Sequence, residues 1–493
     1  MIRREFFKTA ALAGWMLENP GRLLANPVEE FPKSPGLTKY VAEFIVNTKY
    51  ENIPADVVAL GKKTILDGFG LALAGSNSVS GPHIRKYIAK LGCSSDMASV
   101  IGTNMKAPAR FAALANGIAI HADDYDDTGS GVHVAAPVLP AAFSLCELGK
   151  KTGKDLMLAF HVGVEVENKI GEAMSPRHNE DGFHTTGTCG TFGGAAAAAK
   201  LHGLDARQTA VALGIAGSEA SGLRDNFGTM TKPLHAGRAA ENGIVAADLV
   251  LMGWTASEDI LEAPLGFFQA GGGSYKPSLI VNRLGHPWMF ADFGDLIKRF
   301  PCGTIQQAFM DEMLRLVKDN NLKAPDVEKI DIGGNRSNVA TLFRHRPTTG
   351  LEAKFSMEFA VSIILVEGKA GLSQFDDAVV QRSDVQDMIH RSNFRVDPEF
   401  NKAEGSGENL QTVLVEPGII RITMKNGRVI EGKTQPSKGS PQNPMSYDEV
   451  ADKFRGNAEF SKWPSAKAEF IINQVKNLEN LTDMSKMTAA LTS

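Results

Sequence analysis

The chain of 493 residues is long enough for more than one domain, and its 43% hydrophobic and 22% charged residues are typical of globular proteins. A formal net charge of −4 gives no general attraction to nucleic acid, so we exclude nucleic acid as a partner. The cysteines are widely spaced, which argues against a disulfide scaffold or a zinc site: Cys93, Cys146, Cys189 and Cys302.

Residues 1–25 resemble a twin-arginine export signal. Arg3-Arg4 stand before Phe6-Phe7-Lys8 and a short apolar run, TAALAGWML. This run is too short to cross a bilayer, and we expect no membrane span elsewhere in the chain. A functional leader predicts a periplasmic protein. If the segment is instead an ordinary amphipathic helix, the protein is cytoplasmic.

The segment from Thr38 to about residue 260 has the spacing of helices. Apolar residues recur at three- and four-residue steps in LTKYVAEFIVNTKY and in ADVVALGKKTILDGFGLALAG. Alanine-rich stretches such as GTFGGAAAAAKLHGL predict helices with small faces that pack closely in a bundle. A glycine-rich stretch near Gly266 then indicates a change of domain.

The pattern beyond that point mixes strands with helices. VEKIDIGG predicts a short strand, and VLVEPGIIRITMKNGRVIEGK predicts a hairpin with a type I′ turn at Asn426-Gly427. Ser446 to Glu449 form a capping box that opens a C-terminal helical segment. We therefore predict a mainly α protein: residues 26–277 and 437–493 form a large helical-bundle domain, and residues 278–436 form a smaller α+β lid domain. A ligand pocket is expected between the two domains.

The stretch HADDYDDT, residues 121–128, places four carboxylates in five positions. An EF-hand is excluded because the twelfth position counted from Asp124 is Ala135 rather than glutamate. DDYDD also fits the DDxxD pattern by which helical terpene synthases hold magnesium, but no second metal-binding motif follows at a suitable distance. A solvated helix end and a polar rim around a substrate pocket are the remaining interpretations.

Basic residues are concentrated in other loops. FGTMTKPLHAGR contains Lys232, His235 and Arg238, and Pro233 favours a turn at Lys232. His133 and His184 each stand in a loop just before a small-residue helix. The helix after His184 would favour a bound anion at its N-terminus.

These residues suit proton transfer on a small polycarboxylate. Cations stabilise the charge that develops when a proton leaves the carbon next to a carboxylate, and a histidine or aspartate can move that proton. The residues contain no clear metal set, cofactor loop or nucleophile elbow, so we expect neither a metal nor an organic cofactor.

The sequence resembles the MmgE/PrpD family almost from end to end. The resemblance is carried by ILDGFGLALAG, ALANGIAIHADDYDDT, HVAAPVLPAA, GFHTTGTCGTFGGAAAAAKLHGLD, GTMTKPLHAGRAAENG, LEAPLGFF and KRFP. It implies a metal-independent and cofactor-free enzyme, usually a homodimer, with its active site between a helical domain and a lid. Members include 2-methylcitrate dehydratases, decarboxylases and epimerases.

The resemblance also implies a set of site residues. Catalytic candidates are Asp124, His133, His184 and Lys232. Among the substrate-binding candidates, the resemblance implies Thr128 and Lys298, whereas His235 and Arg238 are candidates because they stand in the basic stretch around Lys232.

Two departures from the family pattern bear on the reaction. Gly303 and Phe359 stand where decarboxylating members carry a lid histidine and a lid tyrosine. The sequence therefore favours a hydro-lyase similar to 2-methylcitrate dehydratase over a decarboxylase. An epimerase that uses the same carbanion and a catalytically silent carboxylate-binding relative remain the alternatives.

Overall fold

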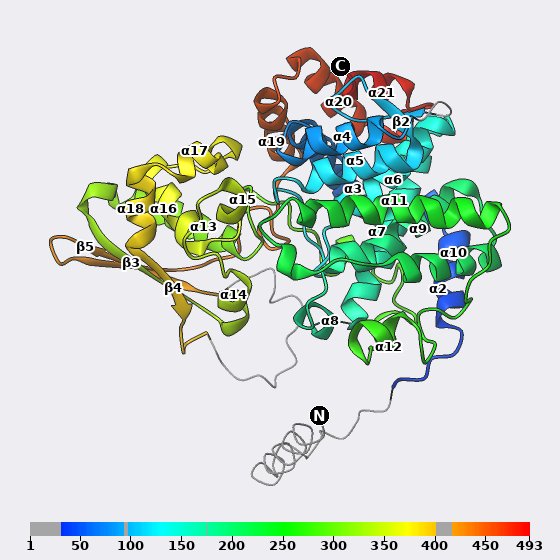
Figure 1. Ribbon diagram of the computed structural model, residues 1–493, viewed down its shortest axis with the longest axis horizontal. Coiled ribbons are helices and arrows are strands. Elements are labelled where there is room, and N and C mark those ends of the chain that lie inside the picture. Colours follow the sequence, from blue (N-terminus) through cyan, green and yellow to red (C-terminus); the bar gives the residue numbers. More distant parts are fainter. Residues whose placement is uncertain (1–30, 93–96, 175, 401–416) are drawn as a thin grey trace, which may run out of the picture.

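The computed structural model describes residues 31–92, 97–174, 176–400 and 417–493. The export-signal prediction for residues 1–25 lies outside these residues. The described part is mostly helical and contains a two-stranded and a four-stranded sheet, which confirms the predicted mainly α fold with an α+β portion (Figure 1). None of its helices is long and apolar enough to cross a membrane.

Helices from both ends of the chain form the helical body. Its N-terminal part contains α2 (Leu37–Asn47), α3 (Ala55–Gly75), α4 (Ser80–Ala89), α5 (Ala109–His121), α6 (Ala135–Leu148), α7 (Gly153–Met174), α8 (Arg177–Glu180), α9 (Thr185–His202), α10 (Ala206–Glu219), α11 (Thr231–Leu251) and α12 (Phe267–Gly272). Its C-terminal part contains α19 (Tyr447–Phe460), α20 (Ser465–Lys476) and α21 (Ser485–Leu491). Helices α19 and α20 pack on α3, so the chain returns to the body after the lid (Figure 1). A small hairpin of β1 (Met97–Ser99) and β2 (Lys106–Pro108) lies beside α5.

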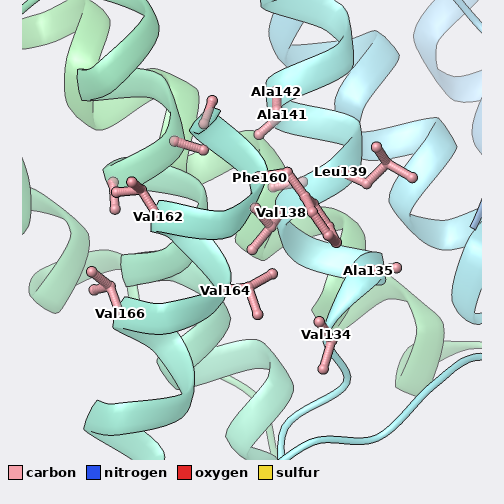
Figure 2. Close-up of a cluster of buried hydrophobic side chains, with 14 of the residues drawn as sticks. Val134, Ala135, Val138, Leu139, Ala141, Ala142, Phe160, Val162, Val164 and Val166 are labelled. Carbon is pink, nitrogen blue, oxygen red and sulfur yellow. The ribbon is translucent and has the colours of Figure 1, made fainter. Parts of the chain in front are cut away.

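The core of the body is built from helix faces with small side chains. Figure 2 shows α6 and α7 packed through valines, alanines and Phe160. Between α9 and α11 the backbones are so close that a β-carbon on Gly243 would lie 2.4 Å from the carbonyl carbon of Gly194. Only glycine allows this approach, as the alanine- and glycine-rich sequence predicts.

The lid is a separate layer of helices on a sheet. Its helices are α13 (Gln306–Asn320), α14 (Arg336–Thr341), α15 (Gly350–Ala353), α16 (Met357–Glu367), α17 (Asp377–Val380) and α18 (Ser383–His390). Its strands are β3 (Val327–Gly334), β4 (Ser392–Val396), β5 (Ile419–Met424) and β6 (Val429–Lys433), in the order β4-β3-β5-β6. The β3–β4 pair is parallel, and the other two pairs are antiparallel.

The predicted hairpin is confirmed, but the predicted turn type is wrong. Gly427 has a φ of 84°, whereas Asn426 is not among the residues with positive φ. The amide of Met424 donates to the carbonyl of Arg428 at 2.8 Å, so the loop has three residues. In such a loop one left-handed glycine restores the strand twist, and a second positive φ is not needed.

The body and the lid each have their own cluster of buried hydrophobic residues. The larger cluster runs from Leu37 to Ile297 and resumes at Met445, and the second runs from Phe300 to Ile430. Residues 280–297, which the sequence assigns to the lid, contribute Ile280, Trp288 and Phe290 to the larger cluster. The exact limits of the two domains stay predictions.

Candidate active site

The acidic stretch forms a buried loop after α5. The helix ends at His121, and Asp124 then adopts a left-handed backbone with φ 49°. Asp124, Asp126 and Asp127 are at most 3% exposed. The interpretation as a solvated helix end is therefore wrong for these three aspartates, and their carboxyl groups need partners inside the protein.

Asp127 has a structural role. Its carboxylate accepts hydrogen bonds from the backbone amides of Val134 and Ala135, at 2.6 and 3.1 Å, where α6 begins. These amides lack partners within the helix, so the carboxyl group of Asp127 provides their acceptor and lies at the positive end of the helix dipole. This contact fixes the path of the loop that carries His133.

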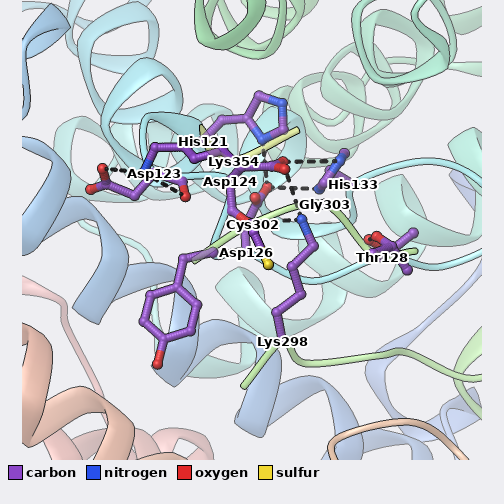
Figure 3. Close-up of polar contacts among 12 residues, drawn as sticks. His121, Asp123, Asp124, Asp126, Thr128, His133, Lys298, Cys302, Gly303 and Lys354 are labelled. Atoms are coloured by element: carbon purple, nitrogen blue, oxygen red, sulfur yellow. Dashed lines mark hydrogen bonds and ion pairs between the residues drawn. The ribbon is translucent and has the colours of Figure 1, made fainter. Parts of the chain in front are cut away.

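Asp124 holds two lysines from different parts of the chain, Lys232 and Lys298, and the second of these is labelled in Figure 3. Lys232, in the first turn of α11, donates from Nζ to Oδ1 of Asp124. Lys298, which precedes the lid, donates to the same oxygen at 3.1 Å and to the Asp124 carbonyl at 2.9 Å. Burial alone would raise the pKa of Asp124, but the two ammonium groups outweigh it and hold the pKa below its ordinary value. Burial lowers the pKa of Lys232, and Asp124 offsets part of that effect.

Asp126 positions two histidines. Its Oδ2 lies 2.8 Å from Nδ1 of His121 and 3.1 Å from Nδ1 of His133. Burial lowers the pKa of His121 to about 3 and also lowers that of His133, because the Asp126 charge offsets only part of the desolvation. The two imidazoles hold the pKa of Asp126 well below 3.8 against the effect of burial. Asp126 is therefore ionised between two neutral rings.

His184 completes a group of imidazoles. It is the residue immediately before α9, and its ring centroid lies 5.6 Å from that of His121 and 6.3 Å from that of His133. Its Nδ1 is 3.1 Å from Nδ1 of His235, and its Nε2 has no hydrogen-bond partner among the described residues. Burial, followed by the charge of Lys232, lowers the pKa of His184 well below 6.5 and that of His235 to about 4. These rings are neutral at neutral pH and can accept protons.

The lid contributes one wall of the site. Phe355 of the lid stacks on Phe227 of the body with 5.5 Å between centroids, and Nζ of Lys232 lies 5.2 Å from the Phe227 centroid and 5.3 Å from the Phe355 centroid. Lys354 of the lid donates to the carbonyl and to Oδ1 of Asp123, at 3.1 and 3.2 Å (Figure 3). These contacts place the cluster where the body meets the lid.

The structure brings together most of the residues predicted from the sequence. Those that share one cluster are Asp124, His133, His184, Lys232, His235 and Lys298. Thr128 lies on the same loop as Asp124, and its hydroxyl is 2.8 Å from that of Thr304 in the lid. Arg238 is not brought into the cluster, because its side chain is 45% exposed and pairs with Glu241 at 2.6 Å.

Phe359, one of the two departures from the family pattern, lies in the core of the lid. It is fully buried, and its ring centroid is 5.0 Å from that of Phe375.

Sequence reasoning missed His121, Asp126, Lys354 and Phe355. His121 and Asp126 stand in the acidic stretch itself, and their five-residue separation across a helix end is the signal that could have paired them. Lys354 and Phe355 have no comparable signal, because only the packing of the lid on the body brings them to the site.

The described residues include groups that could hold a metal ion. Nitrogen atoms of His121, His133 and His184 lie within 4.8 Å of one another, and a second such group combines two of these histidines with Asp124 and Asp126. Imidazole and carboxylate are suitable zinc ligands. However, the two ammonium groups beside Asp124 would repel a metal cation there, so the cluster suits an anionic ligand better.

Comparison with known proteins places the chain in a class of lyases. It belongs to the MmgE/PrpD family: the family's N-terminal domain matches residues 39–279, and its C-terminal domain matches residues 300–480.

Similar proteins include three described as cis-aconitate decarboxylases. The one from Homo sapiens is 30% identical over 470 residues, which cover 92% of this chain and 94% of the relative. The one from Mus musculus is 28% identical, with coverage of 92% and 93%, and the one from Aspergillus terreus is 29% identical, with coverage of 92% and 96%.

Proposed function

We propose that the protein is a hydro-lyase that removes a proton alpha to a carboxylate of a small polycarboxylate and expels a hydroxyl group. The observation that supports this proposal best is the buried cluster in which neutral His133 and His184 lie beside the Lys232–Asp124–Lys298 group. In this proposal neither a metal ion nor an organic cofactor takes part.

The two lysines bind the substrate carboxylates. An ammonium group has three N–H donors, and in the described part of the chain Lys232 uses one of them on Asp124, whereas Lys298 uses two. The remaining donors can bind carboxylate oxygens through charge-assisted hydrogen bonds. Asp124 keeps both ammonium groups close together and thereby positions two donors for one anionic ligand.

A neutral histidine is the base. In this proposal the proton of His133 is on Nδ1, 3.1 Å from the ionised carboxylate of Asp126, and Nε2 carries the lone pair. His133 or His184 takes the alpha proton, and the electron pair of the broken C–H bond forms the carbon–carbon double bond. The hydroxyl leaves with a proton from an acid, and the lowered pKa of Lys232 makes its ammonium group a better proton donor. The products are water and an unsaturated acid.

Decarboxylation of cis-aconitate is the second candidate. Three relatives that match this chain over nearly their whole length are described as cis-aconitate decarboxylases. Gly303 favours dehydration over this alternative, since it provides no polar side chain in the turn that carries Lys298 and Thr304. Epimerisation would use the same alpha proton and return it to the opposite face. Binding without turnover would identify a silent relative.

One panel distinguishes these reactions. The purified protein is incubated in D₂O and EDTA with citrate, 2-methylcitrate, malate, aspartate or cis-aconitate. A hydro-lyase forms an unsaturated acid from a hydroxy acid, a decarboxylase releases CO₂ from cis-aconitate, and an epimerase incorporates deuterium without forming an alkene. Loss of turnover in EDTA that magnesium restores would contradict the metal-independent proposal, and binding without exchange or product would contradict catalysis altogether.

We also propose that the protein is a homodimer, as the family resemblance implies, and that it is exported if residues 1–25 act as a leader. Light scattering of the purified protein measures its mass against the 52.9 kDa of one chain. Fractionation of cells that produce the chain with Arg3 and Arg4 intact, or with both replaced by lysine, tests export. Equal periplasmic amounts of the two would contradict a twin-arginine signal.

A further inference from the structure

The turn between the body and α13 contains a buried polar atom that lacks a partner in the part of the chain that the structure describes. Gln306 is the first residue of α13 and is fully buried, yet its Oε1 has no hydrogen-bond partner among the described residues. Its Nε2 donates to the carbonyl of Ser356 at 2.9 Å. Since that carbonyl can only accept, the amide is oriented with its oxygen away from Ser356. A buried acceptor without a donor is costly and needs an explanation.

The neighbouring Gln307 provides a contrast within the same turn. Its Oε1 accepts from the amides of Arg299 and Phe300, at 3.0 and 3.1 Å, and its Nε2 donates to the carbonyl of Phe300 at 3.0 Å. Gln307 therefore holds the turn together with its hydrogen-bonding capacity in use. Gln306 does not share this role, because half of its amide remains available.

The free oxygen of Gln306 lies where a side chain at position 303 would begin. A β-carbon added to Gly303 would be 2.8 Å from Oε1 of Gln306. The turn is held against the aspartate loop at both ends: Lys298 donates to Asp124 at 3.1 Å, and the hydroxyl of Thr304 is 2.8 Å from that of Thr128. Figure 3 shows Gly303 in the same group as Lys298 and His133. The absence of a side chain at Gly303 thus leaves the amide oxygen uncovered on that side, within the turn that connects Lys298 and Thr304 to the aspartate loop.

We propose that Oε1 of Gln306 accepts a hydrogen bond from the substrate and selects polycarboxylates that carry a donor, a hydroxyl group above all. An ionised carboxylate has only acceptor oxygens and would be repelled by the amide oxygen, and an unsaturated carbon offers no donor. A hydroxyl on the substrate would satisfy the oxygen. This inference rests on the proposed function and extends it, because a hydroxyl is the group that a hydro-lyase expels.

The test compares two tricarboxylates that differ by one hydroxyl group. Binding of citrate and of tricarballylate to the full-length protein is measured by calorimetry, for the wild type, for Gln306→Met and for the surface control Gln381→Met. We expect the wild type and the control to bind citrate about tenfold more tightly than tricarballylate, as for a buried acceptor that gains or lacks its donor. Gln306→Met should bind the two ligands equally.

A second variant keeps the test decisive if Gln306→Met does not fold. Gly303→Ala keeps Gln306 but places a methyl group against its amide oxygen, so it should reduce the preference for citrate as well. Equal affinity of the wild type for both ligands, failure of citrate to bind, or an unchanged preference in both variants would overturn the inference.

The proposed function and the role of Gln306 can be contradicted independently of each other. A wild type that prefers citrate but exchanges no alpha proton with D₂O on any probe would retain the role of Gln306 and contradict catalysis. A wild type that exchanges the proton and binds both ligands equally would retain catalysis and contradict the role of Gln306.

Discussion

The carboxylate of Asp126 accepts a hydrogen bond from Nδ1 of His121 at 2.8 Å, and both side chains are fully buried. Because the pKa of Asp126 is held well below 3.8, the carboxylate is ionised and the proton must reside on the imidazole. The lone pair of His121 is then on Nε2, which has no partner among the described residues. Nδ1 of His133 lies 3.1 Å from the same carboxylate oxygen, although it makes no hydrogen bond among the described residues, so Asp126 fixes the tautomer of His121 and acts on His133 through its charge.

Replacement Asp126→Asn should remove this control. An amide can donate as well as accept, so one or both rings would change tautomer and lose the lone pair at Nε2. We expect kcat to fall by about 10²–10⁴, as for other histidines that lose an orienting carboxylate. The matched control is Asp248→Asn, which alters a surface aspartate 3.1 Å from His202 and should leave kcat unchanged. Equal activity of the two variants would contradict the orienting role.

His184→Asn should lower kcat by about 10²–10⁴, because it removes a proton-accepting group whose Nε2 has no hydrogen-bond partner in the described part of the chain. Ligand affinity should change little, since the binding charges are on the lysines. His202→Asn, at the other end of the same helix, is the control. A loss of affinity equal to the loss of kcat would instead assign His184 to substrate binding.

Lys232→Met should weaken ligand binding by about 10–100-fold, as expected for a lost charge-assisted hydrogen bond. A thermal-shift screen of di- and tricarboxylates measures this effect, because ligands stabilise only the protein that binds them. Lys39→Met, whose side chain is 72% exposed, is the control. Stabilisation by tricarboxylates that persists in Lys232→Met would exclude Lys232 from the binding site.

The pH dependence of kcat/KM should follow the lowered pKa values of the free enzyme. A protonated imidazole is no longer a base, and burial lowers the pKa of both His133 and His184 below 6.5, so activity is lost only as the pH falls below that value. The pKa of Lys232 is lowered from 10.5, so activity also falls as the pH rises toward that value from below. A plateau at neutral pH follows. Half-maximal activity at or above pH 6.5 on the acid side would contradict buried neutral histidines.

Arg238→Ala should change kcat/KM by less than about twofold, because its guanidinium pairs with Glu241 outside the cluster. Steady-state kinetics of Arg238→Ala and Lys298→Met, measured side by side, test this directly. Lys298 donates to Asp124 and should be needed for binding. Loss of activity in Arg238→Ala comparable to that in Lys298→Met would restore the arginine to the site predicted from the sequence.

Much of the fold could be predicted because it depends on local patterns. Small residues at helical spacing indicated close packing, and the structure shows Gly194 and Gly243 in direct backbone contact. The capping box at Ser446 is present as predicted, since its hydrogen bonds lie within four residues. The hairpin turn was predicted incorrectly because Asn-Gly suits both two- and three-residue loops, and only the register between β5 and β6 distinguishes them.

The sequence by itself determined the helical body, the α+β portion and the chemical types of the site residues, because helical spacing, turn residues and motifs are properties of neighbouring positions. Only the tertiary structure decided that Lys232 and Lys298 share one oxygen of Asp124 and that Arg238 lies outside the cluster. It also decided that the amide oxygen of Gln306 has no partner among the residues that the structure describes. The shared oxygen of Asp124 depends on contacts between residues more than 100 positions apart, and the other two outcomes depend on which groups lose water when the molecule packs. Burial and long-range charge pairing are properties of the packed molecule, and they set the protonation states on which the proposed chemistry depends.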